Sequence, residues 1–224
     1  IYKSVLRIRN CDNSISVSTQ VRSGIDTDLV IFPFLDSSLG NTQVEAYATA
    51  CVISSYDNRP IGGLIGFSSN FNTNKKNWRT YYRNLALHEL THVLVFNPNL
   101  FDFFKNPEGK PYNLYDVIII KTINGMRRNL LAYPKVLAAA KKHFNCTSIE
   151  GVELENQGGQ GTASAHWEAR TLLGDFMIGL SFDDIAISEI TLALFEDSGF
   201  YKMNTYTGGL FKFGKNQGCD FLEK

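Results

Sequence analysis

The sequence predicts an α+β fold, because strand-like and helix-like patterns occupy different parts of the chain. Three apolar runs rich in β-branched and aromatic residues, at 28–35, 44–53 and 60–67, are typical of strands. The run at 78–96 instead repeats apolar side chains at helical spacing. We therefore expect a twisted β-sheet packed on a helix, followed by mostly helical and loop structure after Pro98.

The third expected strand, 60–67, contains three glycines. Glycines in a strand suit a neighbour or a substrate that comes close to the backbone. If this strand lay at an exposed edge, it could pair with an extended peptide. A merely bulged or irregular strand explains the same glycines equally well.

The helix at 78–96 contains an HExxH motif formed by His88, Glu89 and His92. Residues four apart lie on one face of a helix, so the two imidazoles can hold a zinc ion with Glu89 beside them. Zinc activates water, and a neighbouring glutamate can move its proton to the leaving amine. The motif therefore predicts a zinc peptidase rather than a chance pattern on an ordinary helix, because its flanking residues also fit a half-buried helix.

A catalytic zinc site usually has a third protein ligand, and two histidines remain as candidates. His143 follows an alanine-rich run that begins at Pro134, where a histidine near a helix end most simply interacts with the helix dipole. His166 lies in the glycine-containing segment 158–170, where a loop lets an imidazole approach a metal. His166 is the better candidate, although spacing alone favours it only modestly.

Three helices are expected in the second half of the chain. The last has the clearest signals, with Ser188 as the N-cap and Gly199 as the terminator. The residues at 145–185, which include His166, should form loops between them. The expected helices are 114–123, one that begins at Pro134, and 188–198.

Several segments resemble the leishmanolysin family of surface and secreted zinc proteases, a branch of the metzincins: HELTHVLVF, GTASAHWEAR, GDFM, TLALFEDSGFYKMN and GKNQGCDF. The resemblance covers most of the chain. It implies a metzincin-like fold with the sheet and active-site helix in an upper lobe and a mostly helical and loop lower lobe. It also implies one Zn²⁺ ion bound by His88, His92 and His166, with Met177 in the Met-turn below it.

One position departs from the metzincin pattern, which has a glycine where this chain has Val95. A β-branched residue disfavours positive φ, so we expect the helix to continue to Asn97 and stop before Pro98. The alternative function is a catalytically impaired surface, adhesion or structural protein that retains the protease fold. The intact Glu89 argues against this alternative, since a structural zinc needs no base.

The chain of 224 residues is long enough for one catalytic unit of two lobes, which we expect at 1–97 and 98–224. The start of the chain resembles a strand rather than a signal peptide, so we expect a portion of a longer precursor.

Composition limits the partners. The 22 basic and 22 acidic residues balance, which argues against a surface for nucleic acid. No apolar run approaches the length of about 20 residues that a membrane span needs. The expected partner is a peptide or protein substrate, and the sequence makes no prediction of the oligomeric state.

Four cysteines, Cys11, Cys51, Cys146 and Cys219, allow three pairings, and four free thiols would suit a cytosolic protein. The resemblance to the leishmanolysin family favours disulfides between Cys11 and Cys51 and between Cys146 and Cys219. It also implies a secreted or cell-surface location, including association with a membrane surface.

Overall fold

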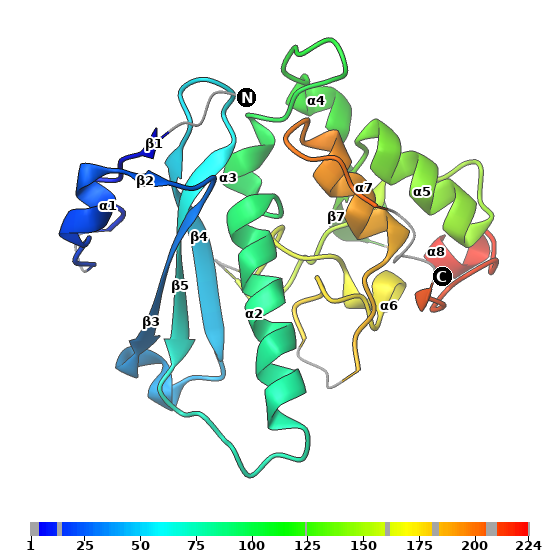
Figure 1. The fold of residues 1–224 in the computed structure, drawn as a ribbon. Coiled ribbons are helices and arrows are strands. Elements are labelled where there is room, and N and C mark those ends of the chain that lie inside the picture. The colour runs from blue at the N-terminus through cyan, green and yellow to red at the C-terminus, as the bar shows by residue number, and fades with distance from the viewer. Residues whose placement is uncertain are drawn as a thin grey trace. The chain divides into compact units, whose positions relative to one another are not determined.

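The computed structural model describes residues 5–12, 15–123, 125–159, 162–180, 184–204 and 210–223. The chain divides into two compact units, Ile1–Leu94 and Val95–Lys224, which are described separately below. Figure 1 labels their helices and strands. The mixture of sheets and helices confirms the predicted α+β class.

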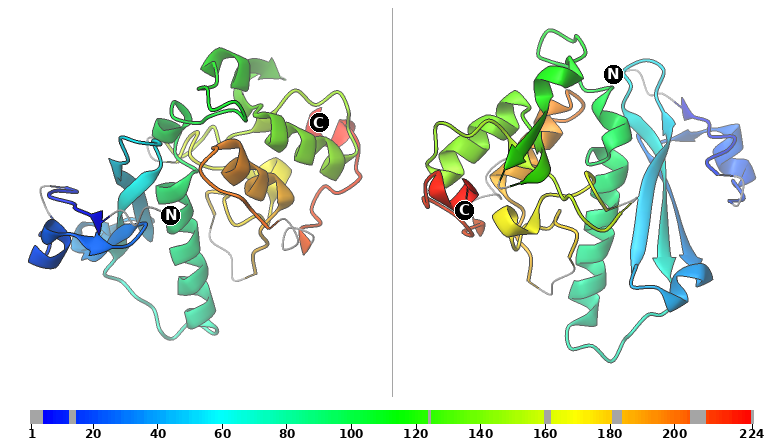
Figure 2. Two further views of the ribbon diagram at one scale, coloured as in Figure 1. Left: turned by 45° about the horizontal axis from the view of Figure 1, so that its top comes forward. Right: turned by 180° about the vertical axis from the view of Figure 1, so that it is seen from behind.

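The first unit is built on a three-stranded sheet in the order β3-β5-β4. The central strand, β5, pairs parallel with β3 and antiparallel with β4. Figure 2 shows this sheet with helix α2 along one of its faces. All three predicted strands are present, as β3 (Val30–Asp36), β4 (Ala46–Ile53) and β5 (Pro60–Ser68).

The glycines of β5 are explained by close packing rather than by an exposed edge. A Cβ at Gly63 would lie 2.2 Å from Cγ1 of Val93 on α2, and one at Gly66 would lie 2.7 Å from the ring of Tyr47. Because β5 is paired on both sides, it has no free edge for an extended peptide. The close neighbour that these glycines suited is therefore present, whereas the conditional possibility of an exposed, peptide-binding edge on β5 is excluded, because the sheet edges belong to β3 and β4.

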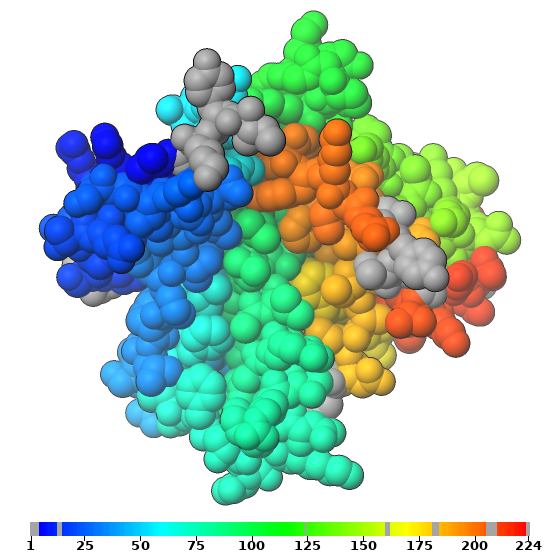
Figure 3. All heavy atoms as spheres, in the orientation of Figure 1, coloured from blue at the N-terminus to red at the C-terminus, as the bar shows by residue number. Residues whose placement is uncertain are grey.

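Helix α2 runs over Trp78–Leu94 and carries the HExxH motif. The segment that leads into it lies at the surface (Figure 3), whereas Tyr81, Asn84, Glu89, Thr91, His92 and Val93 of the helix are buried. The helix ends at Leu94, so the expectation that it continues to Asn97 is wrong.

The helix stops early because the next helix, α3 (Pro98–Phe101), takes Asn97 as its N-cap. The Asn97 side chain accepts a hydrogen bond from the backbone N–H of Asn99. Val95 lies in the intervening turn and is fully buried. It is not among the described non-glycine residues with positive φ, so no left-handed strain falls on its β-branched side chain.

The remaining elements of the first unit flank the sheet. Leu6 and Ile8 of the N-terminal segment make a buried apolar cluster with Val30 of β3. The disulfide between Cys11 and Cys51 ties this N-terminal segment to β4 with a Cα–Cα distance of 5.1 Å. The elements are β1 (Val5–Leu6), α1 (Thr19–Ser23), β2 (Ile25–Asp26) and the 3-10 helix η1 (Ser37–Asn41).

The second unit contains an antiparallel sheet in the order β6-β7-β8. The expected helix at 114–123 is only partly correct, because α4 ends at Val117 and the chain continues as a strand. The β-branched run from Ile118 favours a strand once a partner is present, and β7 supplies the ladder of hydrogen bonds. The bounds are α4 (Leu114–Val117), β6 (Ile118–Ile123), β7 (Met126–Leu131) and β8 (Val152–Glu153).

The other two expected helices are confirmed. Helix α5 (Pro134–Phe144) begins with Pro134 in its first turn, and α7 (Glu189–Asp197) has Ser188 as its N-cap and is followed by Gly199 at positive φ. The segment at 145–185 is mostly loop, as expected, but it includes β8 and the short helix α6 (Ala169–Leu172), and its residues 160, 161 and 181–183 lie outside the described part.

A second disulfide, between Cys146 and Cys219, ties the end of α5 to the segment before the last helix, α8 (Asp220–Glu223). Both disulfides implied by the family resemblance are therefore present. No helix in the described ranges is long and apolar enough to cross a membrane.

Candidate active site

The two histidines of α2 point their ring nitrogens at each other. The Nε2 atoms of His88 and His92 are 3.0 Å apart. In a tetrahedral zinc site, with Zn–N bonds of about 2.0 Å, ligand nitrogens lie about 3.3 Å apart. The helix alone therefore arranges this pair close to the geometry that zinc requires.

Glu89 lies between these two histidines in the sequence, and its carboxylate is buried with an exposed fraction of 3%. Its Oε2 atom has no hydrogen-bond partner among the described residues. Burial raises the pKa of Glu89 to about 8. A buried carboxylate oxygen without a partner is costly for a fold, so the site is suited to a water molecule or a substrate group at this atom.

His166 belongs to the second unit and lies in the loop between β8 and α6. Its Nδ1 is 3.0 Å from the backbone oxygen of Thr162, which makes Nδ1–H the donor in the neutral ring. Burial lowers the pKa of His166, although the hydrogen bond to Thr162 opposes this shift. In a neutral imidazole protonated on Nδ1, the lone pair lies on Nε2, and this tautomer binds metals through Nε2.

Among the described residues, His88 and His92 of the first unit and His166 of the second unit each offer one ring nitrogen that could bind a metal ion. His92 and His166 are buried, and His88 is partly exposed. Three neutral imidazoles are a typical ligand set for Zn²⁺. The remaining histidine, His143, bonds to the Phe213 carbonyl and stacks on Phe211, as a structural side chain does.

Backbone hydrogen bonds hold the loop of His166 on both sides. The carbonyl of His166 accepts from the Glu155 N–H at 2.9 Å, and the Glu168 N–H donates to the Glu153 carbonyl at 3.0 Å. The Trp167 N–H donates to the Met177 carbonyl at 2.9 Å. Met177, which the family resemblance singled out, is therefore hydrogen-bonded to the residue that follows this histidine.

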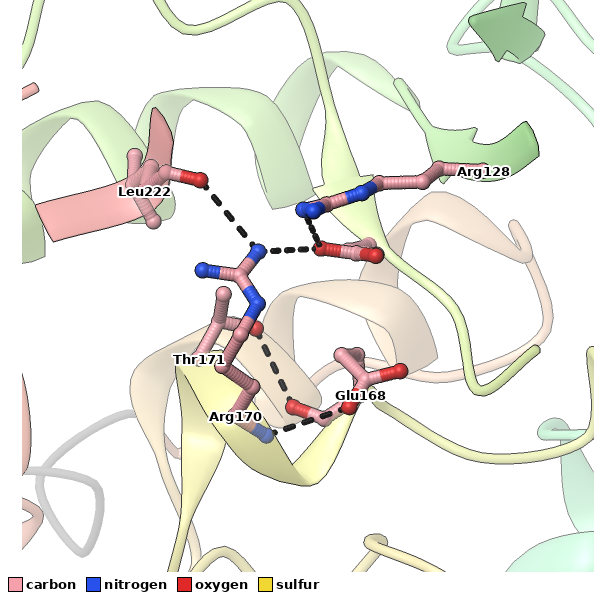
Figure 4. A network of polar contacts seen from close by, with 6 residues as sticks. Arg128, Glu168, Arg170, Thr171 and Leu222 are labelled. Carbon is pink, nitrogen blue, oxygen red and sulfur yellow. Dashed lines mark hydrogen bonds and ion pairs between the residues drawn. The ribbon is translucent and has the colours of Figure 1, made fainter. Parts of the chain in front are cut away.

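A buried ionic network holds the far side of the same loop. Arg128 and Arg170 converge on one carboxylate (Figure 4), that of Glu153, with nitrogen–oxygen distances of 2.9 Å and 2.6 Å. Arg170 also donates to the backbone oxygen of Leu222. The backbone N–H of Arg170 donates a hydrogen bond to the side chain of Glu168, which is the N-cap of α6.

Glu168 and Arg170 anchor the loop through these contacts. Sequence reasoning missed Arg128 and Glu153, which belong to no motif. The available signal was weak: Glu153 is a charged residue between apolar Val152 and Leu154, whereas Arg128 stands between Arg127 and Asn129 and gives no such signal.

An HExxH helix with a third histidine is the arrangement of the zinc-dependent metallopeptidases. The chain matches the family model described as leishmanolysin, peptidase family M8, over residues 6–224. It therefore belongs to the leishmanolysin family of metallopeptidases, as the sequence motifs predicted.

Several similar proteins carry the family name. The leishmanolysin-like peptidase of Caenorhabditis elegans is 29% identical over 250 aligned residues, which cover 96% of this chain and 37% of the relative. The leishmanolysin-like peptidase of Drosophila melanogaster is 33% identical, with 79% of this chain and 30% of the relative covered. Leishmanolysin of Leishmania donovani is 29% identical, with 89% and 31% covered. The chain thus spans 30–37% of the length of these relatives.

Proposed function

We propose that this chain is the catalytic part of a zinc-dependent endopeptidase that hydrolyses peptide bonds in peptide or protein substrates. The observation that carries the proposal is the HExxH pair, in which the Nε2 atoms of His88 and His92 lie 3.0 Å apart; His166 of the second unit is the proposed third ligand. The buried Oε2 of Glu89, which has no hydrogen-bond partner among the described residues, supports the proposal. In this proposal the three histidines bind one Zn²⁺ ion, and Met177 lies in the turn below it.

A bound zinc ion would polarise the scissile carbonyl and increase the acidity of a nearby water molecule. Glu89 would accept a proton from the attacking water and deliver it to the leaving amine. The burial that raises the pKa of Glu89 strengthens it as a base, and a cation beside it lowers the same pKa, so the two effects bring it towards the working pH. The Thr162 carbonyl would keep His166 in the tautomer that presents Nε2.

Two disulfides and the family membership support a secreted or cell-surface location, since disulfides persist in oxidising compartments. We propose this location for the whole protein, with association at a membrane surface.

The test combines metal analysis with peptide cleavage. We expect wild type to retain one zinc ion per chain, and Glu89→Gln to retain the same zinc while cleaving a peptide library at least 10²-fold more slowly. Leu87→Ala, at a position 43% exposed on the same helix, serves as the control and should change neither quantity. Equal cleavage by wild type and Glu89→Gln would refute the proposed base, and zinc-free wild type would refute the metal site.

A further inference from the structure

A fully buried carboxylate in the second unit bonds directly to the turn that contains Met177. The Oδ1 atom of Asp175 accepts from the Met177 N–H at 2.8 Å, and its Oδ2 accepts from the Ser188 N–H at 3.0 Å. The hydroxyl of Thr191 lies 3.0 Å and 2.9 Å from the same two oxygens. Asp175 thus connects the Met177 turn to the start of α7.

The hydroxyl of Thr191 also accepts a hydrogen bond from Nε1 of Trp167, at 2.8 Å. The backbone N–H of Trp167 in turn donates to the Met177 carbonyl. These bonds close a ring that runs from Trp167 through Met177, Asp175 and Thr191 back to Trp167. Both the backbone and the side chain of the residue that follows His166 are therefore held.

The Thr191 hydroxyl uses its hydrogen and its lone pairs within this network. Its one hydrogen is donated to the carboxylate of Asp175, while its oxygen accepts from Trp167 and, at 3.3 Å, from the Ser188 hydroxyl. All of these side chains are buried, where such bonds are strong and an unmade bond is costly. A loop lacks the regular backbone hydrogen bonds of a helix or a sheet. The accurate position of a metal-ligating side chain on a loop therefore depends on contacts of this kind.

We propose that Trp167, Asp175 and Thr191 are positioning residues that hold His166 where a bound metal ion needs it. This inference rests on the proposed zinc site. A purely structural role would make a different prediction. If the three residues position His166, a variant that breaks the ring should bind zinc more weakly than a variant that loses the same stability elsewhere in this unit.

The test removes the central hydroxyl at nearly constant volume with Thr191→Val and keeps it with Thr191→Ser. The matched control is Tyr133→Phe, because the Tyr133 hydroxyl is also fully buried in this unit and donates to the Phe101 carbonyl at 3.1 Å. For each purified protein, the release of zinc to a chelator and the melting temperature are measured.

We expect Thr191→Val to bind zinc 10- to 100-fold more weakly, with Thr191→Ser close to wild type. Tyr133→Phe should lower the melting temperature to a similar extent without accelerating zinc release. Wild-type zinc retention in Thr191→Val would overturn the inference, as would equal zinc loss in Tyr133→Phe.

Should Thr191→Val fail to fold, Trp167→Phe removes only the indole donor, retains an aromatic ring and carries the same expectations. The two proposals fail in different ways. If wild type binds no zinc, the proposed function is wrong and this inference falls with it. If wild type binds zinc and the variants release it at the wild-type rate, only the positioning role is wrong.

Discussion

The buried carboxylate of Glu153 should be one of the most sensitive positions of the second unit. Its side chain is 6% exposed and accepts from two guanidinium groups on the same oxygen. The Arg128 side chain is only 4% exposed, whereas that of Arg170 is 33% exposed. Changing Glu153 to glutamine keeps the shape and an acceptor oxygen but leaves the charge of Arg128 buried without a carboxylate.

Removing one partner of a buried ion pair costs about 3–5 kcal/mol. Water can compensate Arg170, so Arg128 accounts for most of this cost. Because glutamine still accepts a hydrogen bond, we expect the loss of unfolding free energy to lie near the lower limit of this range for Glu153→Gln and near the upper limit for Glu153→Ala. In a protein of this size, each kcal/mol lowers the melting temperature by about 2–4 °C, so the expected decrease is roughly 6–20 °C.

The assay is thermal and urea unfolding at two salt concentrations, with Glu150→Gln as the control. Glu150 pairs with Lys121 at 2.5 Å, but both side chains are exposed, at 51% and 42%. An exposed pair contributes about 0–1 kcal/mol and is screened by salt. Equal losses of stability in Glu153→Gln and Glu150→Gln would show that burial of the ion pair has no energetic role and would refute the reasoning.

Three further outcomes are expected. His166→Ala should lose zinc in equilibrium dialysis while His143→Ala retains it, because His166 is the proposed third ligand and His143 bonds to the Phe213 carbonyl instead; equal zinc contents would contradict this. Burial raises the pKa of Asp197 to about 6, above its unfolded value near 3.8. The stability that the protonated Asp197 carboxyl contributes is therefore fully present below about pH 4 and is lost as the pH rises through 6. In urea unfolding, the unfolding free energy of wild type should fall by up to about 3 kcal/mol relative to that of Asp197→Asn between pH 4 and 7. A pH-independent difference would count against this. Replacing Cys146 and Cys219 by serine should cost about 2–5 kcal/mol, and alkylation of unreduced, unfolded wild type should find no free thiol.

The sequence alone was sufficient for features that depend on local periodicity. Spacing of four residues on a helix fixes His88 and His92 on one face, whatever surrounds the helix. The N-cap at Ser188 and the glycine after α7 are equally local signals, and the structure has both. The family motifs added the disulfide pairing, which four cysteines by themselves leave open.

Local pattern failed where a partner decides the conformation. The run from Ile118 to Ile123 suits a buried helix or a strand, and pairing with β7 selects the strand. In the same way, the glycines of β5 could allow either a substrate or a neighbouring element to approach the backbone. Only the packing of Val93 against Gly63 shows that a neighbouring helix does so. The end of α2 depends on the cap of the helix that follows it.

Only the tertiary structure revealed the residues that support His166. Glu153 lies 25 positions from Arg128, and Thr191 lies 24 positions from Trp167, so no periodic pattern relates the partners. Each is a polar residue whose burial is tolerated only because folding brings a complementary group to it. The sequence thus determined the HExxH motif and the family, while the contacts that hold the loop of His166 depend on long-range packing, which a linear pattern does not encode.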